Sequence, residues 1–264
     1  MYPDRLILFD LAGAMAHFRK FYTNSSSLSY SFPPRTTLCG LIAGILGMPK
    51  DSYYEVFSMA RCRIGLSLRG GIRKVVQTVN YIRTKGPSEL DGSAGPTQVP
   101  LELVMPMPGE GQVVYRVYFW HEDDEVIKEL WERLHSRKFA FPPYFGITEC
   151  PAEIKWTTVV KGEKLEWLSD PEGPLDIATV ILVERIRENG LKLRERIQVL
   201  KDRFPLDFSP GRSLNSIADI LYERNARPLP LVPTGDVFHL LYKDLMGIRE
   251  EYGVFMEVDR DLQR

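Results

Sequence analysis

The order of the periodic segments in the first half of the chain is the feature that most limits how it can fold. Period-2 alternation and short apolar runs mark strands, and a 3.6-residue period marks helices. The order is strand, helix, strand, strand and then, after a long interval, strand and helix, at 5–11, 36–47, 61–68, 72–83, 112–120 and 123–134. This order approximates a βαββαβ unit, whose open sheet is the platform of RNA-recognition domains. We therefore expect an α+β fold.

The helix expected at 36–47 has Thr36 or Thr37 as its N-cap. Gly40 and Gly44 lie four residues apart and so share one face of this helix. Because small residues allow close approach, we expect this face to lie against a sheet.

The long interval at 84–111 is rich in glycine and proline and has almost no helical pattern. Loops of this length inside compact domains are usually functional or disordered. Val99, Leu101 and Leu103 alternate with their neighbours as in the arm of a hairpin. We expect a β-hairpin insertion here, and a disordered linker is the alternative.

The remainder of the chain reads mostly as strands, so we divide the protein into residues 1–150 and a smaller β-rich part, 151–264. Two runs, 177–186 and 191–200, flank Asn189-Gly190, a dipeptide typical of tight hairpins. The second run also fits a helical period. Shorter strands are expected at 216–224, 236–242 and 253–258.

The charges are distributed unevenly along a chain whose net charge is only −1. Residues 1–85 hold twelve Lys and Arg against four Asp and Glu, whereas the other 179 residues hold 22 against 31. A basic segment of this kind indicates a region that faces a polyanion.

Motifs of the common enzyme classes are absent: the sequence has no phosphate loop, no dinucleotide-binding fingerprint and no H-E-x-x-H or C-x-x-C pattern. Its three cysteines and four histidines are scattered, so we expect no metal and no cofactor. No apolar run approaches the ~20 residues that span a bilayer, and the first residues lack the order of a secretory signal. We expect a cytoplasmic protein without membrane contact.

Several motifs resemble those of the Cas-five family, the RAMP-type subunits of type I CRISPR complexes. They are G-x-x-A-x-F-R from Gly13 to Arg19, the serine-rich stretch 23–31, and F-P-P-R-T-T at 32–37. V-N-Y-I-R-T-K at 79–85 and F-P-P-Y-F-G-I-T-E-C-P-A at 141–152 fit the same family. The pattern is closest to the subtype I-B members.

The resemblance implies a ferredoxin-like RAMP domain with a β-hairpin thumb and a smaller β-rich C-terminal part. It further implies that the chain holds the 5′ handle of the CRISPR RNA in the Cascade complex, in antiviral defence. Its partners would be the CRISPR RNA, the backbone (Cas-seven type) subunits and the large subunit, with target DNA engaged indirectly. One subtype uses this protein as a metal-independent endoribonuclease on precursor RNA, which is the first alternative. A protein-interaction module is the second.

The candidate RNA-binding residues combine cations for phosphates, polar groups for 2′-hydroxyls and rings for stacking. They are Arg19, Lys20, Tyr22, Asn24, Ser26, Tyr30, Arg35, Arg73, Lys74, Arg83 and Lys85. Arg35 is included because it stands at the start of the expected helix, where free N–H groups would favour a phosphate. Phe18 and Phe21 are assigned to the core. His17 is the one weak catalytic candidate, as a general base.

Overall fold

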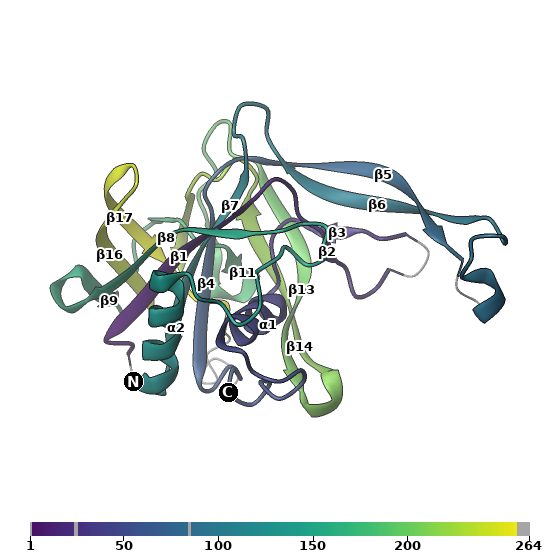
Figure 1. Cartoon of the computed structure of the whole chain (residues 1–264). Coiled ribbons are helices and arrows are strands. Elements are labelled where there is room, and N and C mark those ends of the chain that lie inside the picture. The colour runs from purple at the N-terminus through teal and green to yellow at the C-terminus, as the bar shows by residue number, and fades with distance from the viewer. Residues whose placement is uncertain (1, 24–25, 84–85, 258–264) are drawn as a thin grey trace.

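The structure is a computed structural model that describes residues 2–23, 26–83 and 86–257. It is a mostly-β α+β protein, and the described residues form two α-helices and five sheets. Figure 1 shows a body of stacked sheets and helices from which one long hairpin projects.

The first sheet has a βαββαβ series, but its third strand is 113–121 and not the expected 72–83. Its order is β4-β7-β1-β8, from β4 (Cys62–Leu68), β7 (Val113–His121), β1 (Arg5–Gly13) and β8 (Glu153–Lys161). Helix α1 (Arg35–Leu46) connects β1 to β4, and α2 (Asp124–Ser136) connects β7 to β8. The last strand of this sheet therefore lies beyond residue 150, in the part that the sequence assigned to the second region.

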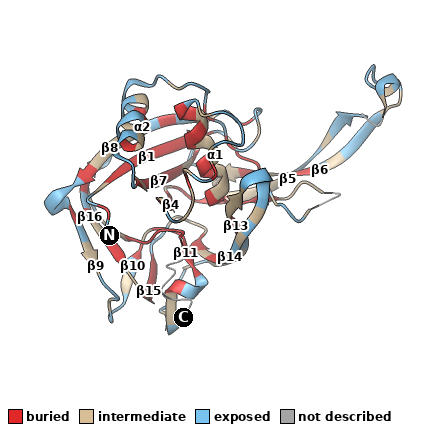
Figure 2. Ribbon diagram, turned by 90° about the horizontal axis from the view of Figure 1, so that it is seen from below, coloured by how far each residue is buried: buried red, intermediate tan, exposed pale blue. Residues whose placement is uncertain are grey.

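Both faces of this sheet are covered, which explains why β1 reads as a continuous apolar run. Ile7 and Phe9 point to one face, where they join a core cluster with Ile42 of α1 and Leu130 of α2. Leu8 points to the other face. Figure 2 shows β1 and β7 as buried strands between the helices and a second sheet.

That second sheet has the order β12-β15-β10-β17-β16-β9. Its strands are β12 (Ile186–Leu191), β15 (Leu229–Pro233), β10 (Leu175–Ile177), β17 (Gly247–Gly253), β16 (Val237–Asp244) and β9 (Leu165–Leu168). Phe238 and Leu240 of β16 pack on Leu6, Leu8 and Tyr118 of the first sheet. The expectation of an open RNA platform is therefore wrong, because apolar side chains of the C-terminal part cover the face opposite the helices.

A third sheet, of order β11-β14-β13, packs beside α1. It consists of β11 (Ile181–Leu182), β14 (Ser213–Glu223) and β13 (Val199–Ser209). Phe204 of β13 stacks on Phe32 with ring centroids 4.3 Å apart. Phe204 and Tyr222 belong to the same hydrophobic cluster as Phe9 and Ile42, so one core includes side chains from both sides of residue 150.

Of the two helices, α2 has a side-chain cap at its start and α1 has none. The side chain of Asp123 caps α2 by accepting from the N–H of Glu125 at 2.9 Å. Helix α1 instead begins after Pro34 with no side-chain cap, so the expected threonine caps are wrong. Pro34 itself is the N-cap residue, with a φ of −54° and a ψ of 156°, so it lies just outside the helical conformation.

The two glycines of α1 do not face a sheet, contrary to expectation. A Cβ at Gly40 would come within 3.0 Å of Tyr53 Oη, and one at Gly44 within 4.0 Å of Phe141 Cβ. These residues line an outer groove of about 540 Å³.

The hairpin expected around Asn189-Gly190 is also absent. Both residues lie inside β12, where Asn189 has a φ of 55° and the register with β15 shifts. A Cβ at Gly190 would meet Arg187 O at 2.6 Å and Val232 O at 2.8 Å, so the pair forms a tight irregularity within a strand. Residues 191–198 form neither helix nor strand after Leu191, and the strand expected at 253–258 ends at Gly253.

The projecting hairpin, called the arm below, consists of β5 (Ile72–Ile82) and β6 (Pro96–Pro106). The strands pair along their whole length, from Ile72 opposite Pro106 to Ile82 opposite Pro96. The insertion therefore starts at 72 rather than 84, because the run 72–83 pairs within the arm and not within the first sheet.

Short elements complete the chain. A two-stranded ribbon joins β2 (Phe18–Arg19) to β3 (Ser29–Tyr30). Single 3₁₀ turns occur at η1 (Pro87–Glu89), η2 (Gly162–Lys164), η3 (Val183–Arg185) and η4 (Pro210–Arg212). No helix in the described ranges is long and apolar enough to cross a membrane.

Candidate nucleic-acid interface

The serine-rich segment lies along the base of the arm and extends its sheet. The N–H of Ala16 donates to Val104 O at 2.9 Å, and the N–H of Val104 donates back at 2.8 Å. Further out, the Ser27 N–H donates to Pro100 O, and the N–H of Glu102 donates to Ser27 O, both at 2.9 Å. These backbone bonds hold the β2–β3 segment as a partial third strand beside β6.

His17 lies in this junction, and its ring is enclosed. Its Nδ1 is 2.8 Å from the backbone oxygen of Glu102, and its Nε2 is 2.9 Å from Ser27 Oγ. A carbonyl only accepts, so Nδ1 donates to it, and in the neutral ring Nε2 then accepts from the hydroxyl. Because His17 is 2% exposed with both nitrogens bonded, it ties the segment to the arm and cannot reach an RNA hydroxyl. The assignment of His17 as a general base does not fit this geometry.

Lys74, at the start of the arm, is engaged within the protein. The Glu102 carboxylate accepts from Lys74 Nζ at 3.1 Å and from Ser29 N–H at 2.9 Å. Lys74 Nζ also donates to Ser29 O at 2.5 Å. Burial lowers the pKa of Lys74 below its ordinary value. Its charge therefore holds the segment in place and is largely neutralised.

Lys20 is likewise paired, with a residue far away in sequence. Its Nζ forms an ion pair with Asp202 of β13, whose carboxylate also accepts from Tyr22 Oη at 3.2 Å. The ammonium lies 5.6 Å from the ring centroid of Tyr22 and 5.5 Å from that of Tyr30. Burial by itself lowers the pKa of Lys20, but the hydrogen bonds to Asp202 and Tyr22 outweigh it and raise the pKa.

Two predicted RNA-binding residues lie in the interior, so these assignments are wrong. The Arg35 side chain is fully buried, where its Nε donates to Glu257 Oε1 at 2.5 Å and its NH2 to Phe57 O at 2.9 Å. Tyr30 is buried and stacks on Phe204 at 4.5 Å. The third sheet and the segment around Glu257 cover the start of α1, so no phosphate can reach it.

The predicted residues that remain at the surface are few. Arg19 is exposed and donates to Thr23 O at 3.2 Å, and Ser26 is half-buried. Tyr22 is 49% exposed. Arg73 is half-buried, and its Nε donates to Pro106 O. Asn24 and Lys85 lie outside the described residues.

Arg83 lies at the far end of the arm, 4.0 Å from Glu89. At about 3.3 Å per residue, it is about 30 Å along β5 from Lys74. The predicted cations therefore do not form one cluster.

Sequence reasoning missed three residues of this interface. Phe21 is 48% exposed and meets Tyr22 edge to face at 5.2 Å, although it was assigned to the core; Phe18 is buried as expected. The position of Phe21 in a polar turn was a usable signal. No signal in the sequence pointed to Glu102 or Asp202, because only the tertiary structure brings them to Lys74 and Lys20.

The arm carries exposed apolar side chains along much of its length. Val76 and Ile82 are each about 60% exposed, and the exposed Tyr81 and Leu90 lie with Ile82 near the far end of the arm. A two-stranded ribbon of this kind is marginally stable alone in water, and exposed apolar groups mark a contact surface. The described part of the outer arm therefore offers mainly apolar side chains for contact.

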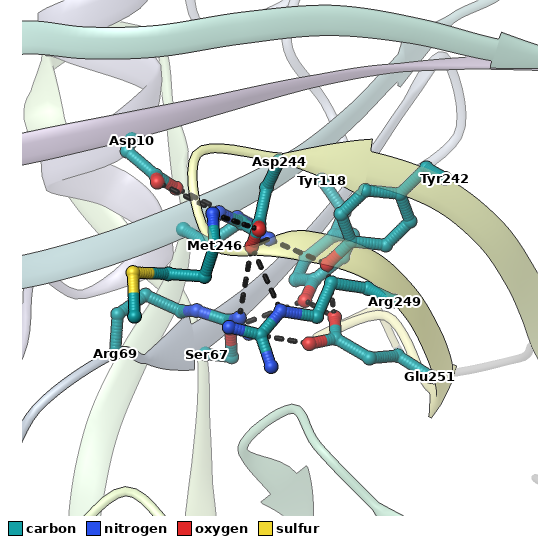
Figure 3. Close-up of polar contacts among 10 residues, drawn as sticks. Asp10, Ser67, Arg69, Tyr118, Tyr242, Asp244, Met246, Arg249 and Glu251 are labelled. Atoms are coloured by element: carbon teal, nitrogen blue, oxygen red, sulfur yellow. Dashed lines mark hydrogen bonds and ion pairs between the residues drawn. The ribbon is translucent and has the colours of Figure 1, made fainter.

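A second charged cluster, shown in Figure 3, lies between the first two sheets. Arg116 of β7 donates from Nε and NH2 to the two oxygens of Asp10, both at 2.7 Å, and from NH1 to Asp244 at 3.2 Å. Arg69 pairs with Glu251 at 2.5 Å. The groups satisfy one another in the interior, so this network joins the sheets. No group of His, Cys, Asp and Glu in the described part of the chain could hold a metal ion.

Comparison with known proteins places this architecture in a family. The family model described as CRISPR-associated protein (Cas_Cas5) matches residues 6–199. The chain therefore belongs to the Cas5 family of CRISPR-associated proteins. No curated protein matches the sequence.

Solved structures were compared with the chain, and one of them shares its fold at low sequence identity. A crystal structure of a CRISPR protein from Archaeoglobus fulgidus is 14% identical, with a TM-score of 0.54 over 95% of this chain and 99% of that one. A chain of a CRISPR RNA-guided surveillance complex is 16% identical, with a TM-score of 0.45 over 85% of this chain and 91% of that one. The first likeness extends the shared fold over nearly the whole chain.

Proposed function

We propose that this protein is the subunit of a type I Cascade complex, of a kind resembling subtype I-B, that holds the 5′ handle of the CRISPR RNA. The elements β1, α1, β4, β7, α2 and β8 would be its ferredoxin-like RAMP domain, and the arm its thumb. Membership of the Cas5 family supports the assignment. The observation that carries it is the projecting arm, whose base is joined by an exposed loop with a cation and two aromatic rings.

The surface residues suggest how a single strand would be held. Arg19 and Arg73 would neutralise phosphates of the handle, and Phe21 and Tyr22 offer rings to its bases. Base stacking on such rings contributes about 1–3 kcal/mol per base. Backbone subunits and the large subunit would meet the apolar outer arm and other surfaces, with target DNA engaged through the RNA.

Cleavage of precursor RNA finds no support at His17, so we propose a binding role. The decisive assay incubates precursor RNA with purified protein in EDTA. The RNA should remain intact, and a discrete product that disappears in His17→Ala would contradict the proposal.

The binding role is tested with RNA that carries the handle. Arg19→Ala combined with Tyr22→Ala should raise the Kd at least tenfold, because it removes one phosphate contact and one stacking surface. The matched control is Lys128→Ala, which removes a cation from the exposed side of α2. Equal affinity of the double variant and the control would refute the assigned surface.

A further inference from the structure

An acidic residue stands where the proposed interface needs a free cation. Asp202 contacts Lys20, Tyr22 and the N–H of Arg203, which donates to Oδ1 at 2.9 Å. The Lys20 and Asp202 side chains are 13% and 14% exposed, so the pair lies at the boundary between interior and solvent. Tyr22, one of the two exposed rings, donates a hydrogen bond to the same carboxylate.

The ion pair between Lys20 and Asp202 affects how a polyanion would bind at the loop. A phosphate and a carboxylate compete for the same ammonium, and they repel one another at short range. Lysine has a flexible stem, so its ammonium can move to a phosphate without moving the backbone. The acidic partner, however, stays within a few ångströms, because β13 holds it.

We propose that Asp202 limits the affinity of this protein for RNA by occupying Lys20 in the free state and by repelling a phosphate that replaces it. This inference rests on the proposed RNA-binding function and names the residue that sets its strength. Asp202 is thus a part of the interface that weakens binding, and neither family membership nor the shared fold assigns it this role.

The test is Asp202→Asn, which removes the charge and keeps an oxygen that can accept from Tyr22 and Arg203. We expect the Kd for handle RNA to fall about tenfold at low salt. Because Lys20 becomes free to neutralise one more phosphate, the slope of log Kd against log salt should steepen by about 0.7.

A matched control separates this local effect from a general change of charge. Asp219 of β14 lies on the same sheet and pairs with Lys201 and Arg203, each at 3.2 Å. Asp219→Asn changes the net charge equally and should alter the Kd less than twofold. Equal effects of the two substitutions would overturn the proposal.

A double-mutant cycle assigns the effect to the pair. In a Lys20→Ala background, Asp202→Asn should change the Kd much less than in the wild type, since there is no ammonium to release. Weaker RNA binding by Asp202→Asn would also overturn the proposal, since it would make the carboxylate a positioning group. Wild-type protein that binds no RNA would instead refute the proposed function itself. Thermal unfolding of each variant identifies any loss that comes from misfolding.

Discussion

Arg35 and Glu257 form a buried ion pair between the first turn of α1 and the end of the described chain. The Nε to Oε1 distance is 2.5 Å, and the same carboxylate accepts from the N–H of Ile64. Burial raises the pKa of Glu257, and the nearby guanidinium opposes that shift. The pair therefore joins α1, β4 and the C-terminal segment, and Asp207 of β13 lies 3.6 Å from the same guanidinium.

Breaking this pair should be costly because it leaves a charge uncompensated in the interior. We expect Arg35→Leu to lower the free energy of unfolding by about 3–5 kcal/mol, measured by urea titration. Lys128→Ala, which alters only the surface, should change it by less than about 0.5 kcal/mol. Similar stabilities for these two variants would contradict the description of Arg35 as an interior residue. Any loss of RNA binding in Arg35→Leu should follow the loss of folded protein.

Stability should depend on pH through His121, which is buried in its neutral form. Its Nε2 is 2.8 Å from Val56 O, and its Nδ1 accepts from the N–H of Asp123. Burial lowers the pKa of His121 below its ordinary 6.5. The unfolded chain then binds a proton at higher pH than the folded protein does, so the contribution to stability is full above about pH 6.5 and declines as the pH falls through the folded value.

This dependence is measured by urea unfolding between pH 8 and pH 5. His121→Gln should flatten the decline below pH 6.5, although it lowers stability at pH 8 by disturbing the two hydrogen bonds. His135→Gln, at the exposed end of α2, should keep the wild-type slope. A wild-type slope in His121→Gln would show that other groups cause the decline.

The outer arm should be dispensable for folding. No described residue between 79 and 99 is buried, and Thr78 stands directly opposite Pro100. Replacing 79–99 by Asn-Gly, a dipeptide suited to a two-residue hairpin loop, should shift the free energy of unfolding by less than about 1 kcal/mol. The same variant should bind handle RNA or assemble with its partners less well. A loss of stability as large as that of Arg35→Leu would mean that the arm supports the core.

The three cysteines should be unreactive in the folded protein. Cys39, Cys62 and Cys150 are free and buried. Burial raises the pKa of the Cys39 thiol to about 11, which leaves almost no thiolate at neutral pH. A thiol reagent at pH 8 should label none of them within minutes and all three after denaturation. Rapid labelling of the native protein would show that the interior opens easily.

The sequence by itself determined the local elements whose signals are strong and short-range. The continuous apolar run of β1 and the amphipathic period of α2 were readable from the sequence, because each depends on neighbouring residues. The family motifs were readable for the same reason, since they occupy contiguous stretches. The basic excess of residues 1–85 was likewise a fact of the sequence.

Only the tertiary structure decided which charges are free. Arg35 pairs with Glu257, and Lys20 with Asp202, across 222 and 182 residues of chain. Burial and ion pairing depend on groups that folding brings within a few ångströms of one another. The periodicity of nearby residues does not predict which distant groups these will be. The same reason applies to the covered face of the first sheet. Phe238, which is far from β1 in the sequence, packs on that face. Within the basic segment 1–85, three of the cations therefore form ion pairs inside the protein: Arg35, Lys20 and Lys74.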